Sequence, residues 1–245
     1  MEDLARAGGD VGVGRGESEA RRRTVLARCP VFAALDAAVL ADVAARASIV
    51  RVVRKQTLYE AADAGQGVWV IASGRVRLAR PTEDQGEVAI GYRGPSELVG
   101  EESLLATSPV HAERATALEN VEAVRLSHRA TSRLLDGQPA AALALARIVH
   151  ERRAQAEARI HGLVAQSVVS RLATFLLDAR KRFGIPESRG TLIGARFTHQ
   201  EIAEWVGATR ETVTLSLGEW KRKGIVVFDH RRIVVVDEPR LAKLV

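Results

Sequence analysis

The sequence predicts an α+β protein in which a small β-roll precedes a long helix and a C-terminal winged helix-turn-helix. Three patterns carry this prediction. Short apolar runs punctuated by glycine and proline fill residues 49–127, as is typical of a small sandwich or jelly-roll-like β-roll. Residues 140–167 are rich in alanine and arginine, which favour helix. Two short helical patterns separated by a glycine follow between Phe197 and Val227.

Length and composition limit the class of protein. The chain has 245 residues, of which 47% are hydrophobic, and this length allows two globular domains. No apolar run is long enough to cross a membrane, and the first 20 residues lack the apolar segment of a signal peptide. The single cysteine, Cys29, allows neither an internal disulfide nor a cysteine-rich metal site. We therefore expect a cytoplasmic protein without a metal.

The positive charge is concentrated near the C-terminus. The net charge is +6, and from Arg171 onward 14 Lys and Arg residues stand against 9 Asp and Glu residues. A basic module attached to a nearly neutral one indicates a partner that carries phosphate groups.

The N-terminal half divides into a tail and a roll domain. Residues 1–21 are rich in glycine and mixed in charge, and we expect them to be disordered. Residues 22–139 are assigned to the roll domain, with a short helix after Pro30, strands up to Ser127 and a further short helix after them. Residues 83–86 are typical of a hairpin tip.

The C-terminal half begins with the long helix over residues 140–167. Its residues Val149, Ala156, Ile160 and Leu163 are spaced roughly as the a and d positions of a heptad, which predicts a contact between two copies. Residues 168–245 are assigned to a DNA-binding domain, and its first helix runs from residue 168 to 183.

The first helix of the helix-turn-helix has recognisable boundaries. Thr198 is a favourable N-cap, and Glu201 lies three residues later, as a capping box requires. Gly207 can adopt the left-handed conformation that ends a helix. The helix is therefore expected between these two positions.

The second helix starts at Thr209, its expected N-cap. At helical spacing its buried face would hold Val213, Leu217 and Trp220. The residues left free of the core near its start are Arg210, Glu211, Thr214 and Leu215. Such a helix offers its N-terminal residues to the DNA major groove, where Arg binds guanine and Glu accepts from cytosine. The final strands around residues 229–231 predict a wing with a basic tip that contacts phosphate.

Three stretches resemble the CRP/FNR family, the cyclic-AMP receptor and fumarate-nitrate reductase regulators of bacteria. They are GRVRLAR, GPSELVGEESLL, and SRLATFLLDARKRFGIP followed by FTHQEIAEWVGATRETV. The last of them is also similar to the cyanobacterial nitrogen-control branch. The resemblance implies a β-roll sensor domain, a dimerisation helix and a homodimer on a palindromic double-stranded DNA operator. It also implies that the protein recruits or blocks RNA polymerase.

The resemblance implies roles for residues of the helix-turn-helix. Arg210 and Glu211 match base-reading positions of the family. The positions that match phosphate contacts are Thr198, His199, Gln200, Thr209 and Thr212. One position departs from the cyclic-AMP receptors, because Leu215 stands where they carry a second arginine. An aliphatic side chain cannot bind guanine but can touch a thymine methyl, so an altered half-site is expected.

The resemblance also implies an effector site in the roll. The matching loop is Gly100, Glu101, Glu102 and Ser103. The family's arginine–serine pair falls on His111 and Ala112 when the chain is counted without gaps, and a shifted register would bring in Arg114. On the long helix, Arg152 and Glu157 match the residues that bind 2-oxoglutarate in the nitrogen-control branch. Cyclic AMP, 2-oxoglutarate, haem and the absence of any effector all remain open.

Other functions are open at this stage. One is a constitutive regulator of the same fold, which needs no effector. Another is a cupin-like metalloenzyme, which would need several inward-facing histidines, whereas His111 is the only histidine between residues 49 and 127. A regulatory module of a kinase or channel would need a catalytic domain or a membrane span. The sequence favours a transcription regulator that is not an enzyme.

Overall fold

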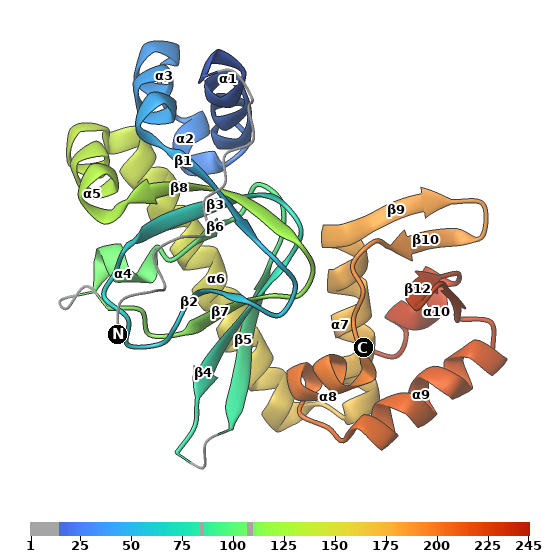
Figure 1. Ribbon diagram of the computed structural model, residues 1–245. Helices are drawn as coiled ribbons and strands as arrows, with labels where there is room; N and C mark the ends of the chain where they lie inside the picture. Colours follow the sequence, from blue (N-terminus) through green and yellow to red (C-terminus); the bar gives the residue numbers. More distant parts are fainter. Residues whose placement is uncertain (1–14, 84–85, 107–109) are drawn as a thin grey trace. The chain divides into compact units, whose positions relative to one another are not determined.

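The structure is a computed structural model that describes residues 15–83, 86–106 and 110–245 (Figure 1). The described residues up to Gly86 and those from Gly91 to Val149 form one compact unit, and Glu87–Ile90 with His150–Val245 form the other. In these ranges, no helix combines the length and the apolar character that a membrane span requires. The predicted α+β class is confirmed, with a sheet-rich N-terminal part, a long helix and a C-terminal helix-turn-helix.

Three short helices open the first unit: α1 (Arg15–Leu26), α2 (Pro30–Ala33) and α3 (Ala37–Arg46). The expectation that residues 1–21 are disordered is wrong for residues 15–21, while residues 1–14 lie outside the described ranges. Leu26 is fully buried in the core, and Arg22 donates from Nε to the carbonyl oxygen of Ala44 at 2.6 Å. The helix therefore forms because it packs against α3, which composition alone did not indicate.

Two four-stranded antiparallel sheets form the roll, with strand orders β1-β8-β3-β6 and β2-β7-β4-β5. The strands are β1 (Ser48–Val52), β2 (Thr57–Tyr59), β3 (Gly67–Ser73), β4 (Val76–Pro81), β5 (Glu87–Arg93), β6 (Leu98–Val99), β7 (Arg114–Ala117) and β8 (Val121–Ser127). The predicted hairpin joins β4 to β5, and Thr82 N donates to Gly86 O at 3.0 Å. Residues 84 and 85 of its tip lie outside the described ranges.

Three further helices follow the strands of the roll. They are the short helix α4 (Glu102–Leu105), α5 (His128–Gly137) and the long helix α6 (Pro139–Ala165). Ala141 and Leu145 at the start of α6 are buried in the same core as α1, α2 and strand β3. Further along α6, the apolar side chains of Val149, Ile160 and Leu163 are 36%, 62% and 41% exposed. The expected seam therefore lies uncovered in the single chain.

The second unit is a helical domain with its own sheet. Its elements are α7 (Val168–Phe183), β9 (Gly184–Glu187), β10 (Gly190–Ile193), α8 (His199–Val206), α9 (Arg210–Arg222), β11 (Val226–Asp229), β12 (Arg232–Val235) and α10 (Glu238–Ala242). The strand order is β11-β12-β10-β9. The wing strands β11 and β12 were predicted, whereas β9 and β10 were not. β9 and β10 are each only four residues long, and β9 contains a proline, so the sequence pattern gives little evidence for strands at these residues.

Candidate nucleic-acid interface and sensor site

The first helix of the helix-turn-helix has the predicted capping box. Thr198 Oγ1 accepts from the backbone N–H of Glu201 at 3.1 Å, and the Glu201 carboxylate accepts from the N–H of Thr198 at 2.6 Å. Gly207 ends α8 with φ of 63°. The left-handed backbone conformation favours glycine here, whereas the atom nearest to an added Cβ, Leu163 Cδ2 at 2.6 Å, is the end of a flexible side chain.

The second helix, α9, separates a buried face from an exposed one. Its buried residues are Val213, Leu217 and Trp220, as predicted. Thr209 caps the helix by accepting from the N–H of Thr212 at 3.2 Å. The exposed face holds Arg210, Glu211, Thr214 and Leu215, and Leu215 is 73% exposed. The helix therefore presents a cation, a carboxylate, a hydroxyl and an aliphatic group together at its N-terminal end.

His199 joins the two helices at this surface. Its Nδ1 lies 2.8 Å from Thr214 Oγ1. Partial burial of the ring, followed by the positive charge of Arg210, lowers the pKa of His199 below its ordinary value of 6.5. The imidazole is therefore neutral at pH 7 in the free protein.

The wing places basic groups near its tip. His230 and Arg231 form the turn between β11 and β12, with φ of 45° and 65°. Arg189, in the turn between β9 and β10, binds the carboxylates of Glu187 at 3.0 Å and Asp229 at 3.1 Å. Glu187 raises the pKa of Arg189 further, so this guanidinium is always charged. The ion pairs connect the outer strands of the four-stranded sheet.

Arg171 was not predicted as a functional residue, yet it holds the turn of the helix-turn-helix. Its guanidinium donates to three carbonyl oxygens, those of Val206 at 2.6 Å, Gly207 at 3.0 Å and Gln166 at 2.6 Å. The first two carbonyl groups lie at the C-terminal end of α8, and the third directly follows the last residue of α6. The only sequence signal was its place at the start of the SRLATFLL stretch.

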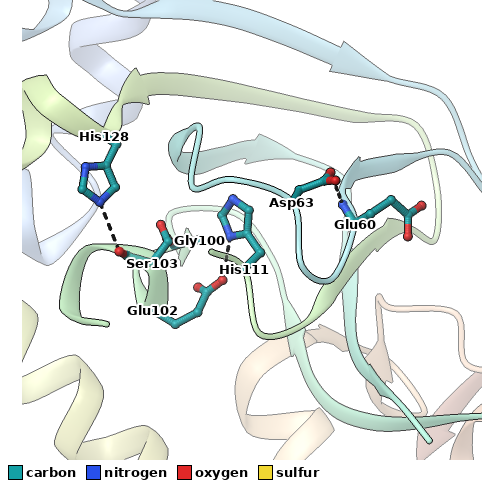
Figure 2. A network of polar contacts seen from close by, with 7 residues as sticks. All are labelled: Glu60, Asp63, Gly100, Glu102, Ser103, His111 and His128. Carbon is teal, nitrogen blue, oxygen red and sulfur yellow. Dashed lines mark hydrogen bonds and ion pairs between the residues drawn. The ribbon is translucent and has the colours of Figure 1, made fainter. Parts of the chain in front are cut away.

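In the roll, the predicted effector loop folds tightly on itself. Gly100 has φ of 85°, and a Cβ there would lie 2.8 Å from the indole of Trp69. Ser103 donates from Oγ to Gly100 O at 2.8 Å, and its own carbonyl oxygen accepts from His128 Nε2 at 3.1 Å (Figure 2). Glu101 and Ser103 are both buried. The loop is thus rigidly placed at the edge of the roll interior.

His111 lies next to this loop, where its ring contacts Tyr59 and Glu102. The ring is 1% exposed and stacks on Tyr59 with centroids 3.7 Å apart. Its Nδ1 contacts Glu102 Oε1 at 2.7 Å (Figure 2). Its Nε2 has no hydrogen-bond partner among the described residues.

Glu113 is a further member of the cluster that was not predicted. It is 7% exposed, and burial followed by the charge of Glu102 raises the pKa of Glu113 to about 7, against lowering by Arg93, Arg80 and His111. Residues 111, 113, 115 and 117 are all buried, but the polar side chains at 111 and 113 gave no such signal in the sequence. The site next to the loop therefore combines an imidazole with several carboxyl groups.

Arg114, another predicted effector residue, does not join this cluster. Arg114 lies on the other face of its strand and pairs with Glu60. Arg152 and Glu157 lie on the part of α6 that belongs to the second unit, and Glu157 pairs with Arg153 at 3.4 Å. Within the described ranges, no three His, Cys, Asp or Glu side chains are placed to hold a metal ion.

Two family models match the chain. The cyclic nucleotide-binding domain matches residues 49–138, and the Crp-like helix-turn-helix domain matches residues 170–244. The first match covers the roll and α5, and the second covers the domain that holds α8 and α9.

The chain is also similar to characterised proteins over most of its length. It is 27% identical over 219 residues to a CRP-like cAMP-activated global transcriptional regulator of Mycobacterium tuberculosis, which covers 89% of this chain and 97% of that protein. It is 29% identical over 187 residues to a global nitrogen regulator of Nostoc, with coverages of 76% and 83%. The solved structure of FixK2 from Bradyrhizobium japonicum shares the fold, with a TM-score of 0.72, 21% identity and coverages of 81% and 96%.

Proposed function

The chain belongs to the CRP/FNR family of transcription regulators, and from this premise we propose that it binds a palindromic DNA operator as a homodimer, gated by an effector in the roll. The observation that carries the proposal is the exposed start of α9. Arg210 and Glu211 project from a helix whose opposite face is buried through Val213 and Leu217. A guanidinium and a carboxylate in that place match guanine and cytosine in the major groove.

Further residues of the proposed interface surround this pair. Exposed and half-buried polar groups flank it in the first turns of each helix, where backbone N–H groups favour phosphate. They are Thr198, His199, Gln200, Thr209, Thr212 and Thr214. The basic wing tip adds Arg231. The M. tuberculosis and Nostoc relatives are both named as global regulators, which supports the same role here.

The proposed dimer contact is the uncovered seam of α6. Ile160 is 62% exposed and Val164 86% exposed in the single chain, although both are large and apolar. A second copy packed along this helix would cover them. The two recognition helices of the dimer then lie in successive major grooves of one operator. We propose that the bound dimer acts in the cytoplasm through a contact with RNA polymerase.

The effector belongs in the roll beside the Gly100 loop. The relative named as cAMP-activated makes cyclic AMP a candidate, and the resemblance to nitrogen regulators adds 2-oxoglutarate. Both ligands are anions, whereas Glu102 and Glu113 bring two carboxyl groups to this place. A constitutive regulator of the same fold is therefore the favoured alternative, and the buried His111–Glu102 pair supports it.

The test is sequence-specific DNA binding. An operator is first selected from a random library with the purified protein, and affinity is then measured by fluorescence anisotropy at several salt concentrations. Arg210→Ala is expected to lose the preference for the selected site by roughly 1–3 kcal/mol. Lys221→Ala is the matched control, because Lys221 is an exposed cation at the other end of α9. Equal specificity of the wild type and Arg210→Ala would reject the proposal.

Effector dependence is tested separately with the same operator. Cyclic AMP, 2-oxoglutarate and haem are each added in a thermal-shift screen, because a ligand of the folded state raises the melting temperature. Operator binding that needs none of them and is unchanged by each supports the constitutive alternative. A shift accompanied by a change in operator affinity supports gating.

A further inference from the structure

A pocket lies outside the roll interior, between α3 and α5. It has a volume of about 450 Å³ and is lined by residues of α3, the end of β8 and α5, all within the first unit. Figure 1 labels these three elements. This volume falls in the range of small-molecule sites. The pocket is separate from the Gly100 loop and from the helix-turn-helix.

Basic side chains line the rim of the pocket. Arg129 and Arg133 are exposed and stand four residues apart, so they share one face of α5. Arg46 is the third cation, and both its Nε and its Nη2 contact Asp42 Oδ1, at 3.1 and 2.8 Å. One acid therefore neutralises one of the three arginines, and the rim keeps the charge of the other two.

Arg129 and Arg133 differ from other arginines on helices in this chain. Arg46, Arg153 and Arg182 each pair with an acidic residue four positions away. Within the part of the chain that the structure describes, the side chains of Arg129 and Arg133 have no ion-pair or hydrogen-bond partner. Two adjacent guanidinium groups repel each other, and an anion between them would relieve that repulsion.

The inner wall of the pocket is apolar. Val43 and Leu126 line it and are buried, and Leu134 on α5 is a third apolar lining residue. A basic rim above an apolar wall suits a ligand that has one anionic group and an apolar body. An inorganic ion has no apolar part that could contact this wall.

We propose that the pocket between α3 and α5 binds a small organic anion, a carboxylate or phosphate attached to an apolar body. The guanidinium groups of Arg129 and Arg133 hold the anionic group, and the body lies against Val43 and Leu134. Only Gln138 separates α5 from α6. A ligand here therefore contacts the helix that leads directly into the long helix.

The test uses the fluorescent aromatic anion 1-anilinonaphthalene-8-sulfonate as the probe with the full chain. The wild type is expected to bind it saturably with a 1:1 stoichiometry. Arg129→Gln/Arg133→Gln is expected to weaken binding roughly tenfold, since two exposed charge contacts are lost. Arg129→Lys/Arg133→Lys keeps the charge and is expected to retain most of the affinity. Because both side chains are exposed, the variants are expected to melt as the wild type does.

Arg28→Gln/Arg54→Gln is the matched control, because it removes two exposed arginines of the same unit away from the pocket. It is expected to bind the probe as the wild type does. Competition then identifies the ligand chemistry. Benzoate and phenyl phosphate are both expected to displace the probe, and the one that displaces it at the lower concentration shows whether the pocket prefers a carboxylate or a phosphate. The proposal is overturned if neutral phenol displaces the probe as well as they do, or if the Arg129→Gln/Arg133→Gln variant binds it unchanged.

Discussion

His199 Nδ1 lies 2.8 Å from Thr214 Oγ1, so the first residue of α8 is bonded to the exposed face of α9. The Thr214 hydroxyl donates its own hydrogen to the carbonyl oxygen of Arg210 at 2.8 Å. The ring must therefore donate from Nδ1. One imidazole thus fixes the spacing of the two helix starts at the surface proposed to read DNA.

This contact predicts a pH effect on stability. Burial and Arg210 lower the pKa of His199, so the unfolded chain takes up the proton more readily than the folded one. The contribution of His199 to stability is therefore fully present above pH 6.5. It is lost as the pH falls through the pKa that His199 has in the folded protein, which is the lower of the two. Urea unfolding at pH 7.5 and pH 5 is expected to show a smaller acid-induced loss for His199→Asn than for the wild type. An equal loss in both proteins would contradict this role of His199.

Glu113, in the roll, predicts a contribution to folding stability that changes with pH in the opposite direction. Its pKa is raised to about 7, so the folded state holds the proton that the unfolded state releases near 4.5. The stabilising contribution is present at pH 4.5 and below and is lost as pH rises through about 7. Glu113→Gln keeps a neutral side chain of the same shape, so at pH 8 it is expected to be more stable than the wild type by about 2–3 kcal/mol. Glu97→Gln serves as a control carboxyl group outside the His111 cluster.

The helix-turn-helix could be predicted almost residue by residue because its signals are local. Thr198, Gly207 and Thr209 specify where helices start and end through their own hydrogen bonds and backbone conformation. The apolar spacing of Val213 and Leu217 then specifies which face is buried. Each signal lies within a few residues of the feature it predicts.

The parts that escaped prediction depend on contacts between distant residues. α1 forms because Leu26 and Arg22 meet α3, about twenty residues later in the chain. Arg171 binds carbonyl groups more than thirty residues away. In the roll, His111 is held beside Glu102 by backbone hydrogen bonds to Ala62 and Asp63, far earlier in the chain, and a single sequence does not specify such pairing.

Leu215 predicts how the operator departs from a site read by two arginines. Its side chain is 73% exposed one turn beyond Arg210 and Glu211. Leu215→Arg is expected to add a preference for guanine at one position of each half-site, worth about 1–3 kcal/mol. Selection from a randomised operator library measures this preference. Leu215→Gln, which has no positive charge, is the control, and an unchanged melting temperature of both variants would confirm that the site is free of the core.

Thr198 is expected to serve both stability and DNA binding. Thr198→Ala removes the capping box of α8 and should lower the free energy of unfolding by about 1 kcal/mol. Ser167→Ala removes the equivalent cap of α7, where Ser167 Oγ accepts from the N–H of Ser170 at 3.2 Å. Both variants are expected to lose similar stability in urea unfolding, but only Thr198→Ala should also weaken operator binding. Equal operator affinity of the two would remove Thr198 from the proposed interface.

Arg171 is expected to control the geometry of the turn through its planar guanidinium. Three carbonyl oxygens at 2.6–3.0 Å surround this group, and lysine offers one compact ammonium that cannot reach all of them. Arg171→Lys keeps the charge yet leaves carbonyl groups of Val206 or Gly207 without this donor. We therefore expect the free energy of unfolding to fall by about 2 kcal/mol. Arg222→Lys, at an exposed site on α9, is the control and should unfold as the wild type does. If Arg171→Lys also matched the wild type, the charge of Arg171 rather than its hydrogen-bond geometry would hold the turn.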